Sequence, residues 1–331
     1  MKIVIIGAGA MGGLFAARLA AAGEDVSVVD VWAEHVETIR TQGLILETGE
    51  GEVRTKPAAV TRVEDLAACA ADLVIVFVKS GMTAAAARSA QTILGPVGRV
   101  LTLQNGLGNA EIIAEVFGAD RVLAGTTAQG ATLIGPGRIR HGGRGDTHIG
   151  RLTGPVDDFC REAAMILSRA GIPAIAEDAV QSLIWGKLVI NVGINALTAL
   201  LRFTNGQLND HAETRELVKL AVAEAVQVAA AAHIPLPYGD AFGCPPAIRQ
   251  RRRKSFGGGG GDGDQPVFNA AGHSPWPGYG DRRHQWGTGP RRSALGSADA
   301  GQCDVNTADQ SPGKTAGNLR ITMKIDSTAK W

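Results

Sequence analysis

Short runs of β-branched and other apolar residues alternate with alanine-rich stretches over the first 150 residues. The first run covers residues 2–6 and is followed by an alanine-rich stretch that ends near Gly23; further runs cover residues 25–29, 72–78, 99–103 and 122–125. Continuous apolar runs of this length, separated by segments of helical length, are typical of a parallel sheet with helices on its faces. The pattern therefore predicts an α/β fold with a doubly wound parallel sheet.

The first apolar run leads directly into a glycine-rich turn. Gly7 permits a tight turn, Gly9 lets the backbone approach a pyrophosphate, and Gly12 lets the following helix pack close to the strand. The second run ends in Asp30, at about the distance expected of an acid that binds a ribose hydroxyl. The alternative is a glycine-rich turn without a ligand. We predict a Rossmann-type dinucleotide-binding domain over residues 1–155, whose cofactor site includes Gly7, Ala8, Gly9, Ala10, Met11, Gly12 and Asp30.

Two later strands of the predicted sheet end in polar residues. Lys79 follows Val78, and Gln104, Asn105 and Gly106 follow the run at 99–103. Ligands of open α/β sheets lie beyond the carboxyl ends of the strands, so both positions fall where a cofactor and a substrate would bind. Asn-Gly is also an ordinary turn dipeptide, and Lys79 could be a solvated surface lysine. Their shared location favours the functional interpretation.

After about residue 150 the pattern becomes helical, which predicts a smaller all-α domain over residues 156–242, with helices near 157–170, around Lys187 and over 213–232. In residues 185–195, Lys187, Asn191 and Asn195 are four residues apart and share one helix face, while apolar residues cover the others. We therefore expect a helix that is buried nearly all round, with its polar stripe facing a cleft. A buried lysine needs a partner or a ligand; the alternative is a structural polar network between packed helices.

Charge and composition set the expected environment. The formal net charge of +1 gives no general attraction to nucleic acid or to an anionic membrane, and we find no apolar run long enough to cross a bilayer and no signal peptide. These features predict a cytoplasmic protein without nucleic-acid or membrane partners. The four cysteines lack metal or redox spacing and the seven histidines are scattered, so no metal site is predicted.

The chain resembles the 2-dehydropantoate 2-reductase (ketopantoate reductase) family. The resemblance covers roughly residues 1–240, through GAGAMG, FVKS, LQNGLGN, GTTAQGA, THIG, WGKLVINVGINALTAL and TNGQL. It implies NADPH-dependent reduction of 2-dehydropantoate to pantoate, a step of pantothenate biosynthesis. It further implies that Lys187 is the general acid, that Asn105 orders Lys187 and the cofactor, and that Lys79 lies by the nicotinamide. The substrate would be held by Lys187, Asn191, Asn195 and Asn205.

The residue types fit this chemistry. Hydride transfer to a ketone carbon develops negative charge on oxygen, which an ammonium stabilises and protonates. Partial burial would lower the pKa of Lys187 towards neutrality. The family resemblance implies NADP, but Asp30 with Val31 behind it favours a free ribose hydroxyl and repels a phosphate, so NAD is the alternative. Another 2-keto or β-hydroxy acid reductase and a non-catalytic dinucleotide-binding module are the rival functions; the expected partner is a small keto acid, and a homodimer is compatible with the sequence.

The tail, residues 243–331, departs from the family. It contains a basic run, five glycines from Gly257 and few aliphatic residues, a composition that cannot bury a core and predicts disorder. Codons permitted for Gln265 to Gly287, read one nucleotide later, can spell SLSSMLQDIARGRATEIDAING, the segment that the family has and this chain lacks. We therefore predict a frameshift between about Phe242 and Phe256, which removes the family's substrate-binding serine and active-site glutamate. The alternative is a natural basic tail that binds nucleic acid.

Overall fold

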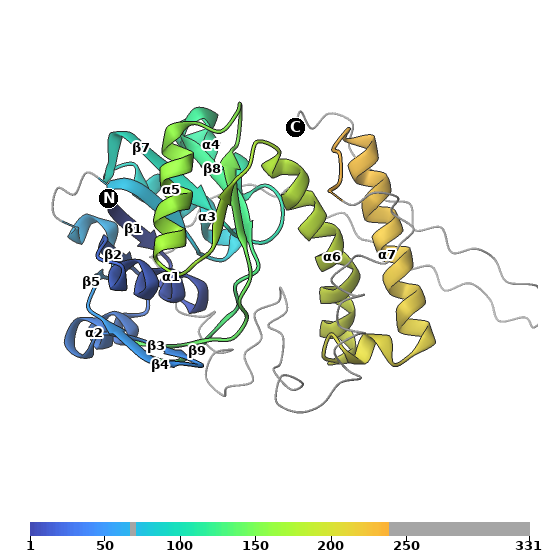
Figure 1. Ribbon diagram of the computed structural model, residues 1–331, viewed down its shortest axis with the longest axis horizontal. Helices are drawn as coiled ribbons and strands as arrows, with labels where there is room; N and C mark the ends of the chain where they lie inside the picture. The colour runs from blue at the N-terminus through green and yellow to red at the C-terminus, as the bar shows by residue number, and fades with distance from the viewer. Residues whose placement is uncertain (67–70, 238–331) are drawn as a thin grey trace, which may run out of the picture. The chain divides into compact units, whose positions relative to one another are not determined.

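The computed structural model describes residues 1–66 and 71–237. The predictions for residues 238–331, namely the predicted disorder of the tail and the predicted frameshift, lie outside the described residues. Within the described part, an α/β unit built around a large sheet is followed by a pair of long helices (Figure 1).

The large sheet has eight strands in the order β12-β11-β8-β7-β6-β1-β2-β5. All neighbouring strands pair in parallel except β11, which is antiparallel to β8. The order reverses at β1, which lies between β2 and β6, and such a reversal marks the ligand-binding edge of an open α/β sheet. The strands are β1 (Lys2–Ile6), β2 (Asp25–Val29), β5 (Ala58–Val60), β6 (Ala71–Val76), β7 (Leu94–Thr102), β8 (Val122–Thr127), β11 (Thr147–Arg151) and β12 (Ala174–Ala176).

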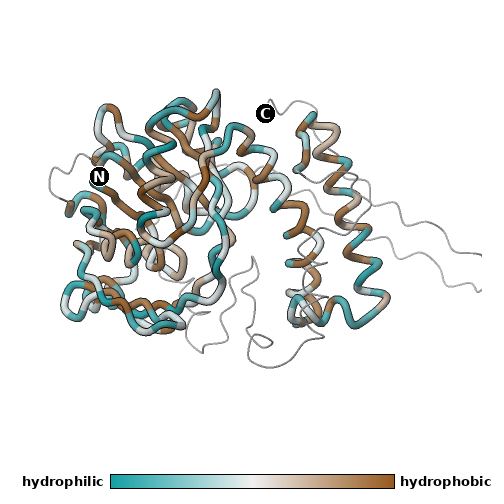
Figure 2. The backbone as a smooth tube through the Cα atoms, in the orientation of Figure 1, coloured by the Kyte–Doolittle hydropathy of each residue, from teal (hydrophilic) through white to brown (hydrophobic). Residues whose placement is uncertain are grey.

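Each face of this sheet has its own apolar core. Along β1, Ile3 and Ile5 belong to one cluster and Val4 and Ile6 to the other, as the alternation of side chains in a strand requires. The first cluster is covered by α1 (Ala10–Ala21), α2 (Ala33–Gln42) and α5 (Asp158–Arg169), and the second by α3 (Thr83–Ala90) and α4 (Asn109–Phe117). Figure 2 shows the hydrophobic strands between the two helical layers. The predicted doubly wound α/β fold is confirmed.

The structure adds a second sheet that the sequence analysis did not predict. Its strands, in the order β4-β3-β10-β9, are β3 (Leu44–Thr48), β4 (Gly51–Thr55), β9 (Ala131–Gly135) and β10 (Arg138–His141). This sheet packs on α1, where Gly13 lies so close to Ile139 that a Cβ would come within 2.8 Å of its side chain. The outer face carries ion pairs such as Arg138 with Glu47, so the strands lack the continuous apolar run that identified the others.

Helix α5 differs from its predicted place. The sequence analysis assigned residues 157–170 to the second, all-α domain, but α5 packs on β11 and β12, and Cys160, Ile166 and Leu167 join the core shared with α1. Asp157 caps this helix by accepting the Cys160 backbone N–H, and its carboxylate also pairs with Arg99. The sheet unit therefore continues to β12, beyond the boundary predicted at residue 155.

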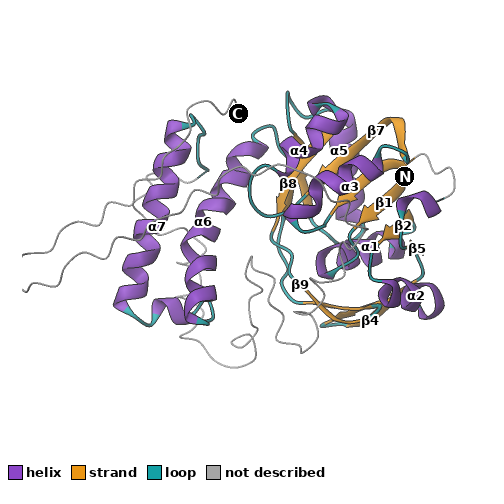
Figure 3. Cartoon of the chain, turned by 180° about the vertical axis from the view of Figure 1, so that it is seen from behind, coloured by secondary structure: helices purple, strands orange, loops and turns teal. Residues whose placement is uncertain are grey.

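The remaining described elements are the long helices α6 (Val180–Leu201) and α7 (Ala212–Ala231), which lie side by side (Figures 1 and 3). Gly193 of α6 faces Val218 and Val222 of α7, and a Cβ there would come within 2.8 Å of Val222. Single-turn 3₁₀ helices complete the described elements: η1 (Val63–Asp65), η2 (Ser80–Met82), η3 (Ala119–Arg121) and η4 (Gln207–Asn209).

The prediction that the Lys187 helix is buried nearly all round is wrong for the described residues. Leu200 of α6 is 80% exposed, and Val192 and Leu201 are exposed as well, although α7, β8, β11 and η4 pack against other parts of the helix. By length and mean hydropathy, α6 could also cross a membrane, contrary to the expectation that no apolar run is long enough. Apolar helices in the core of folded proteins have the same length and mean hydropathy. Along α6, moreover, Lys187, Asn191 and Asn195 form a polar stripe.

Candidate active site

The carboxyl ends of five neighbouring strands form the edge on which the predicted site residues gather. Along the order β8-β7-β6-β1-β2, the strand ends and the segments that follow them carry Thr127, Asn105, Lys79, the glycine turn and Asp30. Four strand spacings separate the outer two, a span of about 19 Å. An elongated ligand lying across the strand-order reversal at β1 would therefore pass all of these positions.

The glycine turn between β1 and α1 has the geometry that its sequence suggested. Gly7 has φ +95°, and a Cβ there would lie 2.9 Å from the backbone of Phe77, so the turn fits only glycine. At Gly12 a Cβ would lie 1.8 Å from the carbonyl oxygen of Gly7. At Gly9, in contrast, no atom lies within 4 Å of the Cβ position. Gly9 therefore faces open space at the N-terminus of α1, where a pyrophosphate could approach the backbone closely.

Asp30 is fixed beside this turn by two backbone donors. Its Oδ2 accepts the N–H of Ala8 at 2.8 Å, and its Oδ1 accepts the N–H of Trp32 at 2.9 Å. The carboxylate thus carries its negative charge at the end of β2, next to the glycine turn. Ala10 and Met11 form the first turn of α1, which contains no acidic side chain that would compete with a bound phosphate.

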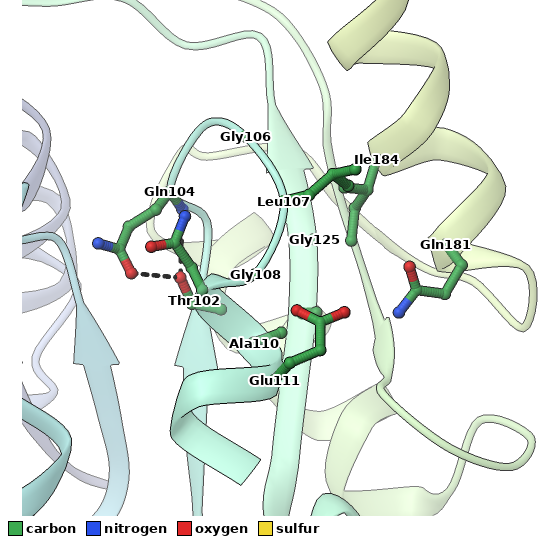
Figure 4. A pocket seen from close by; sticks show the side chains of 12 residues that line it. Thr102, Gln104, Gly106, Leu107, Gly108, Ala110, Glu111, Gly125, Gln181 and Ile184 are labelled. Carbon is green, nitrogen blue, oxygen red and sulfur yellow. Dashed lines mark hydrogen bonds between the residues drawn. The ribbon is translucent and has the colours of Figure 1, made fainter. Parts of the chain in front are cut away.

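Lys79 and Asn105 occupy the loops after β6 and β7, and both side chains are exposed. The loops are tied together by Gln104, whose Nε2 donates to the Val78 carbonyl at 2.6 Å and to Thr83 Oγ1 at 2.9 Å. Its Oε1 accepts the hydroxyl of Thr102, a bond drawn in Figure 4. This network keeps Lys79 and Asn105 on neighbouring positions of the edge.

The Asn105 loop is also held from α4. Asn109 donates to the Asn105 carbonyl oxygen at 3.2 Å and accepts the hydroxyl of the buried Thr83 at 2.9 Å. In the described part of the chain no hydrogen bond joins Asn105 to Lys187, so the ordering contact implied by the family resemblance is not present in this conformation.

Lys187 reaches the sheet edge from α6. Its Nζ donates a hydrogen bond of 2.8 Å to the carbonyl oxygen of Thr127, at the end of β8. Burial lowers the pKa of this amine from 10.5 to about 8. Among residues 1–66 and 71–237, no carboxylate lies within ion-pair distance of it. The ammonium therefore has one neutral partner and can interact with an anion or a developing oxyanion.

Two of the three asparagines lie on α6 with Lys187. With a rise of 1.5 Å per residue, Asn191 is about 6 Å and Asn195 about 12 Å away along the helix axis, and Asn205 lies in the turn that follows the helix. The Oδ1 atom of Asn205 is buried without a hydrogen-bond partner among the described residues. The structure thus brings Asn191 near Lys187 but does not gather all three asparagines.

A small pocket of about 20 Å³ lies between the Asn105 loop and the first turns of α6. Leu107 from the loop and Ile184 from α6 lie on its upper side in Figure 4, with Glu111 and Gln181 below them. None of these four residues was singled out in the sequence, because their common location depends on how α6 meets the sheet.

Sequence reasoning also missed the groups that hold the predicted residues in place. Thr127, Gln104 and His35 act through hydrogen bonds to residues 26 to 102 positions away in the chain. The GTTAQGA motif contained Thr127, but its contribution is a backbone carbonyl, which no side-chain pattern reveals.

The fold and this edge define a dinucleotide-binding α/β protein with a helical second part. Comparison with known proteins gives the family. The sequence model described as ketopantoate reductase PanE/ApbA matches residues 3–154, and that of the family's C-terminal part matches residues 179–251. The chain therefore belongs to the ketopantoate reductase family.

Individual relatives agree. A 2-dehydropantoate 2-reductase of Halobacterium salinarum is 40% identical over 238 residues, which are 70% of this chain and 76% of the relative. One of Pyrococcus horikoshii is 36% identical over 211 residues, 64% of this chain and 67% of the relative.

Solved structures show the same fold. D-mandelate dehydrogenase with NADH and anilino(oxo)acetate has a TM-score of 0.70 and 30% identity, covering 78% of this chain and 80% of the other. A PanE/ApbA family ketopantoate reductase from Ralstonia eutropha JMP134 has a TM-score of 0.67 and 32% identity, and the match covers 77% of this chain and 81% of the other.

Proposed function

We propose that this chain is built to reduce 2-dehydropantoate to pantoate with a nicotinamide dinucleotide. Family membership supports the reaction, since the relatives are named for it. The observation that carries the mechanism is the buried amine of Lys187, with a lowered pKa and no acidic partner in the described chain, at the carboxyl edge of the sheet. When bound, the cofactor supplies the hydride for the ketone carbon.

Lys187 is the proposed general acid. The ketone oxygen gains negative charge as the carbon accepts the hydride, and an ammonium beside it stabilises that charge and donates the proton that completes the hydroxyl group. A pKa of about 8 makes this donation easier than the ordinary 10.5 would, while the amine is still mostly protonated near neutral pH. The amine is replenished by a proton from solvent after each turnover.

The asparagines are proposed to hold the substrate. Amide groups can bind the carboxylate and hydroxyl oxygens of a keto acid without adding charge. Asn191, one turn from Lys187, is the nearest, and Asn195 and Asn205 would require the substrate or the helix pair to extend the site. Asn105, whose backbone is held by Asn109, is proposed to contact the cofactor and to orient Lys187 when the substrate is bound.

The cofactor would be held along the sheet edge by residues whose geometry fits it. The open space at Gly9 and the N-terminus of α1, with Ala10, Met11 and Gly12, suit the pyrophosphate, while Gly7 and Ala8 shape the turn. Asp30 would bind the adenosine ribose, and Lys79 would lie by the nicotinamide end.

NADPH and NADH remain two distinct proposals. The family resemblance implies NADPH. The fixed charge of Asp30 favours NADH, because a carboxylate binds a ribose hydroxyl and repels a 2′-phosphate. A structural neighbour in this family fold, D-mandelate dehydrogenase, was solved with NADH. Comparing kcat/KM for the two cofactors with 2-dehydropantoate decides between them.

The test of the reaction is a spectrophotometric assay of the full chain with 2-dehydropantoate and each reduced cofactor, over a range of pH. Because the general acid must be protonated in the free enzyme, kcat/KM should be constant below about pH 8 and fall above it. Cofactor binding without reduction of any keto acid would support a dinucleotide-binding module instead. Faster reduction of another 2-keto acid would favour a related reductase.

The remaining expectations are carried as proposals. The formal net charge of +1 is the support for a cytoplasmic protein without nucleic-acid or membrane partners. A second part that ends at residue 242 and a homodimeric assembly are further proposals. Light scattering of the purified chain would establish the oligomeric state.

A further inference from the structure

His35 is a buried polar residue that the proposed reaction does not use. It lies in the first turn of α2, and its side chain is 0% exposed. Both ring nitrogens have partners from distant parts of the chain: Nε2 is 3.0 Å from the Ala8 carbonyl oxygen, and Nδ1 is 2.9 Å from the Gly137 backbone nitrogen. The imidazole therefore connects the glycine turn to the loop between β9 and β10.

The two partners define the protonation of the ring. The Gly137 N–H can only donate, so Nδ1 must accept and cannot carry a proton. The proton of the neutral ring is then on Nε2, where it is donated to the Ala8 carbonyl. Burial lowers the pKa of His35, against the opposing charge of Asp30, and so favours this neutral form.

The bond to Ala8 has a consequence for the neighbouring peptide. The Ala8 carbonyl belongs to the same planar, trans peptide group as the Gly9 N–H, so the two point in opposite directions. A carbonyl held towards His35 in the core turns the Gly9 N–H away from the core. Gly9 is the residue of the turn that faces open space.

The other side of Ala8 is held as well. The Ala8 N–H donates to Asp30, and the Gly7 N–H donates to the Val29 carbonyl at 2.8 Å. The peptide groups before and after Ala8 are thus fixed by Asp30, which follows β2, and by His35 of α2, respectively.

We propose that His35 is a positioning residue of the cofactor site, which turns the Gly9 N–H towards the pyrophosphate by holding the Ala8 carbonyl. This inference rests on the proposed dinucleotide cofactor. A different role would be purely structural: fixing the β9–β10 loop through Gly137, with no effect on the turn. The two roles use different nitrogens of the ring, so they can be separated.

Two amide substitutions each keep one of the two bonds. The amide nitrogen of His35→Gln reaches the Nε2 position and can still donate to Ala8, whereas the amide oxygen of His35→Asn reaches the Nδ1 position and can still accept from Gly137. His148→Gln, which removes a histidine paired with Glu177 at the far end of the sheet, is the matched control. Dissociation constants of NADH and NADPH are measured by fluorescence titration, and thermal melting is recorded for each protein.

The proposal expects His35→Gln to bind the preferred cofactor within about threefold of the parent chain, and His35→Asn to bind it at least tenfold more weakly, with His148→Gln unchanged. Equal losses in both His35 variants, or a larger loss in His35→Gln, would overturn it. If the parent chain binds neither cofactor, the proposed function itself has failed.

A second measurement needs no variant. Nitrogen NMR of the histidine-labelled parent chain should show His35 as the neutral ring protonated on Nε2. A ring protonated on Nδ1 or on both nitrogens would contradict the proposal.

Discussion

The sheet unit and the helix pair α6–α7 differ in how completely the described chain covers them. In the sheet unit, the strands β1, β6 and β7 carry residues that are 0–1% exposed, and two cores close both faces. In the helix pair, Leu200, Leu201, Leu217 and Leu220 are all at least 42% exposed. The cofactor half of the site is therefore specified within the described residues, whereas the substrate half presents apolar surface of the kind that folded proteins cover.

This difference in coverage indicates which property of the chain is weakened by the altered tail. The match to the family's C-terminal model ends at residue 251, within the segment where we predict the frameshift. Cofactor binding should therefore be close to that of the family, and turnover should be the property that suffers.

The largest effect is expected at Lys187, where the two regions meet. Lys187→Ala removes the proposed general acid, so kcat should fall by about 10²- to 10⁴-fold, while the dissociation constant of the cofactor changes little. Steady-state assays measure kcat, and fluorescence titration measures the dissociation constant of the cofactor. An equal loss of turnover and cofactor affinity would refute the assigned role.

The next effect separates the tight turn from the looser helix pair. Gly12→Ala places a Cβ 1.8 Å from a backbone oxygen and should lower the free energy of unfolding by about 3 kcal/mol. Gly193→Ala meets the tip of Val222 at 2.8 Å and gains helix propensity, so its cost should be about 1 kcal/mol or less. Denaturant unfolding measures the free energy of unfolding of both variants. A larger loss in Gly193→Ala than in Gly12→Ala would contradict the difference in packing between the sheet unit and the helix pair.

Restoring the predicted reading frame should raise turnover. Codons permitted for this chain, read one nucleotide later from the Gln265 codon onward, can encode the family segment with its serine and glutamate. Two regained hydrogen bonds to a charged substrate are expected to raise kcat/KM by roughly 10- to 100-fold. Equal cofactor affinity of the given and the frame-corrected chain would show that the tail affects only the substrate half of the site. An unchanged kcat/KM would show that the tail does not limit the reaction. Resequencing the gene checks the frameshift itself.

The smallest effect concerns Asp30. Asp30→Asn keeps the side chain's size and an oxygen for the Ala8 N–H but removes the charge. The ratio of kcat/KM with NADPH to that with NADH should rise by about tenfold, or roughly 1.4 kcal/mol. No change in this ratio would show that Asp30 does not face the 2′ position of the ribose.

The parts of the fold that sequence predicted are those encoded by short, local patterns. The glycine turn, Asp30 and the apolar strands could be predicted because each requirement lies within a few residues. The second sheet could not, because β3, β4, β9 and β10 come from two distant segments and carry charged outer faces. Helix α5 was assigned to the wrong side of the domain boundary, since its amphipathic pattern does not say which surface it covers.

The site shows the same limit. The polar stripe on α6 correctly marked which residues share a face, but the helix is more exposed than its composition suggested, because burial depends on what packs against it. His35 gave no signal as one of seven scattered histidines, since its partners lie 27 and 102 positions away.

The neutral acceptor at Lys187 has a thermodynamic consequence. Because Thr127 offers a carbonyl rather than a carboxylate, an arriving keto acid would be the first negative charge that the amine meets in the described chain. The substrate's charge should raise the pKa of the Lys187 amine above about 8. Near and just above pH 8, the amine is partly deprotonated in the free enzyme, so it should take up a proton from solution when the keto acid binds. Calorimetry in buffers of different ionisation enthalpy would register this uptake as a heat that varies with the buffer.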